Sequence, residues 1–305
     1  GFASSRLMIL EGLSGTGKSS LPLAFMDFMG AETSIVPVQS SWKDRNDLLG
    51  FYNDFKKQYK ETEFLNALYR AVRDPSRVHI IVLDEMNISR IEYYFADFLS
   101  VLQNPDDMRI LDLVSDSAGV TSTPESWPEY IQDGKLAITN NIWFIGTANK
   151  DDSTMTITDK VYDRAVVIEF EDKGSKRPDL SYAKPVKVNI EDFTSALRGA
   201  KWAKGDRQSY EALIAELSAK VKELFHINFG NRIEQQLETF IPAYVACGGT
   251  VGEAVDIMFA RKILRKLEGF YDEDTKERLG KLSTLAKSRS LRVTSDVISR
   301  MMREI

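Results

Sequence analysis

A short apolar strand that runs into a glycine-rich loop and then a helix is the feature that most constrains the fold of this chain. Residues 6–11 have the composition of a buried strand, and the loop Gly12-Leu13-Ser14-Gly15-Thr16-Gly17-Lys18-Ser19 follows at once. The loop fits the pattern G-x-x-x-x-G-K-[ST], in which glycines let backbone N–H groups converge on phosphate oxygens. A chance glycine-rich turn is the alternative, and the flanking strand and helix argue against it. The pattern therefore predicts a nucleotide-binding α/β fold with a parallel sheet flanked by helices.

The loop also predicts which atoms hold the phosphates. Lys18 is expected to reach the β- and γ-phosphates, and the Ser19 hydroxyl to take one Mg²⁺ position. The helix that follows points its positive end at the same phosphates. The predicted binding residues are Gly12, Leu13, Ser14, Gly15, Thr16, Gly17, Lys18, Ser19 and Ser20.

A second apolar run, residues 78–83, ends in two carboxylates, Asp84 and Glu85. Such a run is typical of a strand buried on both faces, and ligands of open parallel sheets bind beyond the carboxyl ends of their strands. Asp84 is predicted to hold Mg²⁺, directly or through water, and Glu85 to deprotonate the attacking water. The alternative is an acidic strand end that caps the next helix. After this pair, apolar residues at 91, 94, 95, 98, 99 and 102 follow helical spacing, which indicates a core-facing stripe rather than a platform for bases.

A third apolar run, residues 141–149, ends in Asn149, whose amide could bridge the γ-phosphate and the attacking water. Arg164 lies further along, just before a strand predicted over residues 165–170. Isolated arginines are usually surface charges, but an arginine supplied by a neighbouring subunit is a recurring device in phosphoryl transfer. Glu85, Asn149 and Arg164 are therefore the candidate catalytic residues.

Composition excludes several other classes of protein. The 40 basic and 45 acidic residues give a net charge of −5, which excludes a broad basic surface as a nucleic-acid footprint, although a local patch remains open. Cys247 is the single cysteine, and this count fits a reducing compartment such as the cytoplasm. His79 and His226 are isolated, so a zinc site is not expected. No apolar run approaches the ~18 residues of a membrane span, so no membrane association is expected.

Beyond residue 172 the pattern changes. Residues 173–189 are charged and contain two prolines, which indicates a linker, and residues 190–305 carry helical stripes typical of a small all-α lid domain. Arg261, Lys262, Arg265 and Lys266 form a predicted basic face, interpreted as a solvated helix flank or, alternatively, a DNA contact.

Together these motifs resemble the AAA+ ATPases, in the branch of McrB-like and MoxR-like proteins with a dynein-related module. The resemblance rests on Gly12 to Ser19, on residues 83–87 (Leu-Asp-Glu-Met-Asn), on residues 146–149 (Gly-Thr-Ala-Asn) and on residues 159–164 (Asp-Lys-Val-Tyr-Asp-Arg). It also draws on residues 47–52 (Asp-Leu-Leu-Gly-Phe-Tyr) and 228–232 (Asn-Phe-Gly-Asn-Arg). The resemblance covers most of the chain and implies a large α/β domain over residues 1–172.

The resemblance also implies roles and an assembly. Asn149 is similar to the sensor 1 residue, Arg164 to the arginine finger, and Arg232 to the sensor 2 residue of the lid, although the family more often has an aromatic residue at position 231. Residues 106–140 are similar to a hairpin insertion that faces the ring pore or a partner, with a solvated loop as the alternative. The implied assembly is a homo-oligomeric ring, expected to be a hexamer.

The nucleotide base and the cellular role are less constrained. Residues 149–152 spell N-K-x-D, a pattern that reads guanine in GTPases, yet the family places this strand beside the phosphate loop. ATP is therefore expected, with GTP as an alternative. A McrB-like restriction or defence motor implies a nuclease or other effector subunit and DNA. A MoxR-like protein-remodelling chaperone, a monomeric P-loop kinase and a nucleotide-gated binding module with negligible turnover are the alternatives.

Overall fold

In the computed structural model, residues 1–53, 55–114, 127–151, 154–170, 186–268 and 272–305 are described. The chain divides into two compact units, and the boundary falls between Ser195 and Ala196, inside α7 (Ile190–Gly199). The first unit holds nearly all of residues 2–195, and the second holds residues 196–305 with Gly1 and Ala3. Residues 173–185 of the predicted linker lie outside the described residues.

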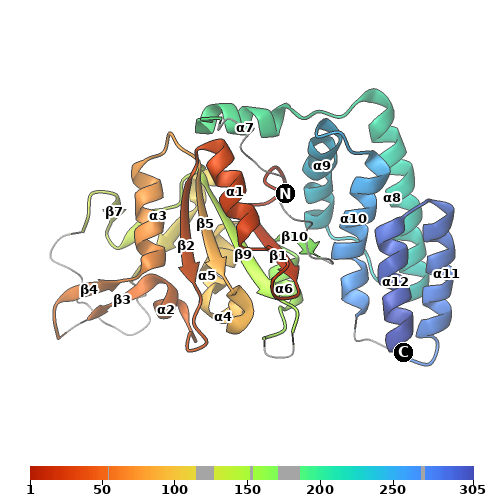
Figure 1. The fold of residues 1–305 in the computed structure, drawn as a ribbon, viewed down its shortest axis with the longest axis horizontal. Coiled ribbons are helices and arrows are strands. Elements are labelled where there is room, and N and C mark those ends of the chain that lie inside the picture. The colour runs from red at the N-terminus through yellow and green to blue at the C-terminus, as the bar shows by residue number, and fades with distance from the viewer. Residues whose placement is uncertain (54, 115–126, 152–153, 171–185, 269–271) are drawn as a thin grey trace. The chain divides into compact units, whose positions relative to one another are not determined.

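A parallel five-stranded sheet forms the centre of the first unit (Figure 1). Its strand order is β10-β1-β9-β5-β2, and every neighbouring pair is parallel. The three inner strands, β1, β9 and β5, are buried almost throughout, as expected for a sheet covered on both faces. The strands are β1 (Leu7–Gly12), β2 (Glu32–Pro37), β5 (His79–Asp84), β9 (Ile142–Asn149) and β10 (Val166–Phe170).

Helices and short connections surround this sheet (Figure 1). Helix α3 is strongly amphipathic, and the Thr62 hydroxyl caps it by accepting from the Leu65 N–H at 3.2 Å. The helices of this unit are α1 (Ser20–Met29), α2 (Arg45–Leu49), α3 (Glu63–Arg73), α4 (Ile91–Tyr94), α5 (Ala96–Val101), α6 (Asp159–Tyr162) and the start of α7.

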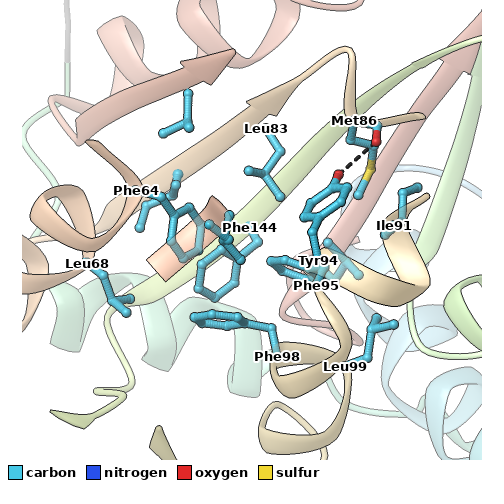
Figure 2. Packing of buried hydrophobic residues seen from close by; sticks show 14 of the residues in the cluster. Phe64, Leu68, Leu83, Met86, Ile91, Tyr94, Phe95, Phe98, Leu99 and Phe144 are labelled. Atoms are coloured by element: carbon cyan, nitrogen blue, oxygen red, sulfur yellow. Dashed lines mark hydrogen bonds between the residues drawn. The ribbon is translucent and has the colours of Figure 1, made fainter. Parts of the chain in front are cut away.

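An aromatic cluster fills the core between α3, α5 and the sheet (Figure 2). Phe64, Phe95, Phe98 and Phe144 are fully buried, with ring centroids 5.0–6.4 Å apart. The Tyr94 hydroxyl donates to the Met86 carbonyl at 2.7 Å, and burial raises the pKa of this tyrosine. The stripe predicted over residues 91–102 does face the core, but the helix is interrupted at Phe95, which separates α4 from α5. The period alone did not reveal this break.

Two small antiparallel sheets stand apart from the central one. One pairs β3 (Gly50–Asn53) with β4 (Gln58–Glu61), and the other joins β6 (Ile110–Asp112), β7 (Ile131–Gln132) and β8 (Lys135–Ala137) in the order β6-β8-β7. The predicted hairpin insertion, residues 106–140, thus contains the β7–β8 hairpin, while its residues 115–126 lie outside the described part.

The second unit is helical over its described residues. The helical stripes predicted within residues 190–305 supply its core, with Leu217, Val221, Ile241 and Val255 at 0% exposure. Its helices are the end of α7, α8 (Lys204–Phe225), α9 (Asn231–Ala246), α10 (Val251–Lys262), α11 (Thr275–Ser288) and α12 (Arg292–Glu304).

The basic face predicted in this unit differs from the expected solvated flank. Helix α10 ends at Lys262, so Arg265 and Lys266 lie in a separate short 3₁₀ segment. Lys262 is only 3% exposed, and the other three residues are half-buried. Spacing in the sequence could not show that α10 ends at Lys262 or that Lys262 is buried. Separately, among the described helices of the whole chain, none combines the length and the apolar character that crossing a bilayer requires.

Candidate nucleotide site

The glycine-rich loop joins β1 to α1 with backbone angles that favour glycine. Gly15 and Gly17 have φ of +77° and +93°, which residues with a Cβ rarely adopt. Gly12 approaches β10 so closely that a Cβ would lie 2.4 Å from the Phe170 carbonyl oxygen. The loop glycines therefore serve the shape of the loop and its close approach to the sheet.

The Lys18 side chain folds back over this loop. Its ammonium donates to the carbonyl oxygens of Gly12 at 3.0 Å and Leu13 at 2.7 Å, and the residue is only 6% exposed. Burial lowers the pKa of Lys18, and the nearby carboxylates of Asp151, Asp84 and Glu85 act in the opposite direction. The loop thus holds a desolvated ammonium group at the carboxyl ends of the strands, where it can bind a phosphate.

Asp84 and Ser19 come together from residues 65 positions apart. The Ser19 hydroxyl donates to Asp84 Oδ1 at 2.8 Å, and the Thr147 hydroxyl donates to the same oxygen at 2.7 Å. A hydroxyl beside a half-buried carboxylate is a donor set that suits Mg²⁺, which prefers oxygen ligands and retains several waters. These residues therefore fit the predicted metal site.

Glu85 follows Asp84 in a conformation unusual for a residue with a side chain. Its φ is +54°, in the left-handed region, and its N–H donates to the Thr147 hydroxyl at 2.8 Å. The side chain is exposed, whereas the neighbouring Met86 and Asn87 are buried. This turn separates the two carboxylates, because Asp84 stays in the hydrogen-bond network and Glu85 faces solvent, where it could accept a proton from water.

Asn149 lies beside the start of the phosphate loop. β9 runs next to β1, as the family resemblance predicts, and Asn149 is paired in register with Gly12. The Asn87 side chain holds the Asn149 backbone: its amide nitrogen donates to the Asn149 carbonyl at 2.8 Å, and its amide oxygen accepts from the Asn149 N–H at 3.1 Å. Within the described residues the Asn149 side-chain amide makes no hydrogen bond, so it is available to a ligand.

A buried ionic group lies behind the loop. Glu11 is 2% exposed and lies in register with Glu169 on the neighbouring strand β10. Lys150 reaches both carboxylates, at 3.6 Å from Glu11 and 2.5 Å from Glu169, and the Tyr162 hydroxyl donates to Glu11. This group connects the end of the Asn149 strand to the phosphate-loop strand and to α6, which precedes Arg164.

Arg164 lies just before the amino-terminal end of β10, whereas the phosphate loop lies at the carboxyl ends of the strands. Gly12 pairs with Phe170, whereas Arg164 comes two residues before Val166, the partner of Met8. At ~3.3 Å per strand residue, Arg164 is roughly 20 Å from the loop end of its own strand. The side chain is half-buried, and its guanidinium donates to the Leu99 carbonyl. Arg164 therefore does not join the site of its own chain.

Arg232 belongs to the second unit. It is the second residue of α9 and is exposed. Its role as a sensor 2 residue remains a prediction.

Two residues of the site carried no assigned role in the sequence analysis. Thr147 and Asn87 both lie in quoted motifs, yet each acts through contacts with residues 62 or 63 positions away. A threonine in an otherwise apolar strand was the available signal for Thr147. For Asn87, which is 4% exposed, the available signal in the sequence was its position after the carboxylate pair.

The fold and this arrangement define a P-loop nucleoside-triphosphatase site, with phosphate loop, hydroxyl–carboxylate pair and polar strand end side by side. The model of one family, the AAA domain of the dynein-related subfamily, matches residues 7–165, more than half of the 305-residue chain, and the chain belongs to this family.

Among solved structures, the chain is similar to a crystal structure of a candidate ATPase from Cytophaga hutchinsonii, with a TM-score of 0.55 and 14% sequence identity. The alignment covers 100% of this chain and 86% of that one, and at this identity it supports the fold alone. No curated protein matches the sequence.

Proposed function

We propose that this chain hydrolyses ATP at sites completed by a neighbouring copy of itself, in a ring, expected to be a hexamer. One observation carries the proposal: Arg164 lies at the amino-terminal ends of the strands, and its own phosphate loop lies at their carboxyl ends. A guanidinium placed there can reach a triphosphate only in another subunit. AAA domains commonly assemble into rings, and this geometry is the one that such an assembly requires.

Within each site the proposed roles follow from the contacts. The backbone of Gly12 to Gly17, with Lys18, binds the phosphates, and Ser19 and Asp84 hold Mg²⁺, which neutralises phosphate charge when bound. Glu85 orients the attacking water and takes its proton, and the Asn149 amide positions that water against the γ-phosphate. Arg164 of the neighbouring subunit stabilises the charge that develops during transfer.

ATP is the proposed nucleotide rather than GTP. Residues 149–152 spell the guanine-reading pattern N-K-x-D, but Asn149 is paired with Gly12 beside the phosphate loop. The Lys150 ammonium is engaged by Glu11 and Glu169. Both observations support a role near the phosphates and not at the base.

For the work done by hydrolysis we propose a McrB-like motor that moves DNA together with a nuclease or other effector subunit. A MoxR-like chaperone would instead couple hydrolysis to protein remodelling. Stimulation of hydrolysis by DNA, measured against stimulation by an unfolded protein, distinguishes the two roles.

Mixing two inactive variants tests the proposal. Arg164→Ala keeps the phosphate loop and loses the finger, whereas Lys18→Ala keeps the finger and loses the loop's cation. Their mixture should regain part of the wild-type hydrolysis at hybrid interfaces, while each variant alone stays inactive. Absence of recovery at every mixing ratio would contradict action between subunits.

Protein concentration gives a second, independent test. Specific hydrolysis should rise with concentration as rings assemble, and it should be lost in Glu85→Gln while nucleotide binding persists. A specific activity that does not change with concentration would favour the monomeric kinase, and hydrolysis retained in Glu85→Gln would exclude Glu85 as the base.

A further inference from the structure

The hairpin formed by β3 and β4 borders a groove that none of the nucleotide-site residues lines. The groove has a volume of about 860 Å³ and lies between the hairpin residues Asn53 and 56–61 on one side and Trp127, Pro128 and Ile131 on the other. Figure 1 shows the hairpin apart from the strands of the central sheet. A volume of this size is in the range that ligand sites occupy, ~300–1,000 Å³.

The charge of the groove is opposite to that of the chain. Among the described residues that line it are three lysines, Lys56, Lys57 and Lys60, and one carboxylate, Glu61, and all four are exposed. The whole chain carries a net charge of −5. This local excess of cations on an acidic protein selects for a polyanion.

Aromatic rings lie between the lysines. Trp127 and Tyr59 pack in the groove with centroids 5.7 Å apart, and both are half-buried. Phe55, in the turn between the strands, is fully exposed, and Phe51 is 41% exposed, with the Lys60 ammonium 5.8 Å from its ring. A fully exposed phenylalanine beside lysines has no packing role within the described residues of its own unit, and its faces are free to stack.

The hairpin is fixed at both of its ends. The Tyr59 hydroxyl donates to the Leu49 carbonyl at 3.2 Å, and burial raises the pKa of Tyr59 to about 12. In the turn, the Asn53 side chain accepts from the N–H groups of Phe55 and Lys56, each at 3.1 Å. These bonds hold the Tyr59 ring and the backbone of the turn before any ligand binds, which lowers the entropy cost of binding.

We propose that this groove binds single-stranded nucleic acid. Lysines that track a phosphate backbone and rings that stack on bases are the two elements of such sites. A duplex hides its base faces and would use only the lysines, and an acidic peptide would leave the rings unused. The site goes beyond the proposed hydrolysis, because binding here requires neither Lys18 nor Arg164.

The test is the binding of a fluorescent oligodeoxythymidine of ~15 nucleotides to the full chain, without nucleotide, followed by anisotropy. Lys56→Glu/Lys60→Glu should weaken binding at least tenfold, whereas Lys276→Glu, a charge reversal on α11 in the second unit, should not change it. The logarithm of the affinity should fall with the logarithm of the salt concentration with a slope of about −2 for three phosphate contacts.

Tryptophan fluorescence tests the stacking of bases on Trp127 separately from the lysine contacts. The oligonucleotide should quench tryptophan fluorescence in the wild type and fail to do so in Trp127→Phe, with folding of each variant checked by circular dichroism. No binding, equal weakening by Lys276→Glu, equal affinity for a duplex, or equal competition by polyglutamate would each overturn the proposal. Because none of these measurements uses hydrolysis, their failure is distinct from a failure of the proposed function.

Discussion

The Asn87 side chain pairs with the Asn149 backbone in the way that a neighbouring strand would. It donates to the Asn149 carbonyl at 2.8 Å and accepts from the Asn149 N–H at 3.1 Å. A third bond, from the Asn87 amide nitrogen to the Met155 carbonyl at 3.3 Å, ties Met155 to the same side chain. The position of the proposed sensor is thus set by a residue that follows the carboxylate pair.

Replacing Asn87 with alanine should lower kcat about 100-fold with little change in KM, because misplacing a reacting group by ~1 Å can have that effect. Loss of buried hydrogen bonds should also lower the free energy of unfolding by about 1–3 kcal/mol. The measurement is steady-state hydrolysis together with urea denaturation. Asn104→Ala, which removes an exposed asparagine that bonds only to a loop carbonyl, is the matched control. Lowered stability with an unchanged kcat would show that Asn87 has no positioning role.

Thr147→Val should weaken Mg²⁺ binding, so that hydrolysis requires a higher Mg²⁺ concentration. The Thr147 hydroxyl donates to Asp84 at 2.7 Å and accepts from the Glu85 N–H at 2.8 Å, so its loss frees both carboxylate residues at once. We expect kcat to fall ~10–100-fold and the apparent Mg²⁺ affinity to fall about tenfold, as for other outer-shell partners. A magnesium titration of activity measures both, and Thr147→Ser should restore them. Unchanged magnesium dependence in the valine variant would exclude this role.

Lys150→Met should destabilise the protein through the carboxylates that it leaves behind. Glu11 and Glu169 are buried neighbours, and removing the cation between them is expected to cost the low end of ~3–5 kcal/mol, because the lysine side chain is 35% exposed. Chemical denaturation at pH 7.5 measures the change. Lys281→Met, which breaks an exposed pair with Glu277, should have a much smaller effect, because solvent screens an exposed ion pair. A loss of stability no larger than that of Lys281→Met would contradict this role of Lys150.

Stability should fall as the pH drops below the ordinary histidine value, partly because of His79. Burial lowers the pKa of His79 below 6.5 in the folded chain, against the opposing effects of Asp74 and Glu32. Below pH 6.5 the unfolded chain therefore binds a proton that the folded chain does not, and unfolding is favoured. Between pH 7.5 and 5.5 this amounts to at most about 1.4 kcal/mol. Denaturation at both pH values should show a smaller loss in His79→Gln than in the wild type; equal losses would contradict the assignment.

Local sequence determined the elements of this protein. Backbone preference and the spacing of apolar residues, which both act over a few residues, determine the local elements. These are the strand before Gly12, the loop glycines, the apolar run before Asp84 and the helical stripes of the lid. The same local logic missed the break at Phe95 and the burial of Lys262, because both depend on what packs against them.

Only the tertiary structure decided which of these elements meet. The order of the strands placed Asn149 beside Gly12. It also allowed Thr147 to bond to Asp84, 63 residues earlier, and Tyr162 to bond to Glu11, 151 residues earlier. It also placed Arg164 at the opposite ends of the strands from its own phosphate loop. Hydrogen bonds between distant residues depend on the register of strands that the whole core selects, and no window of sequence contains that information.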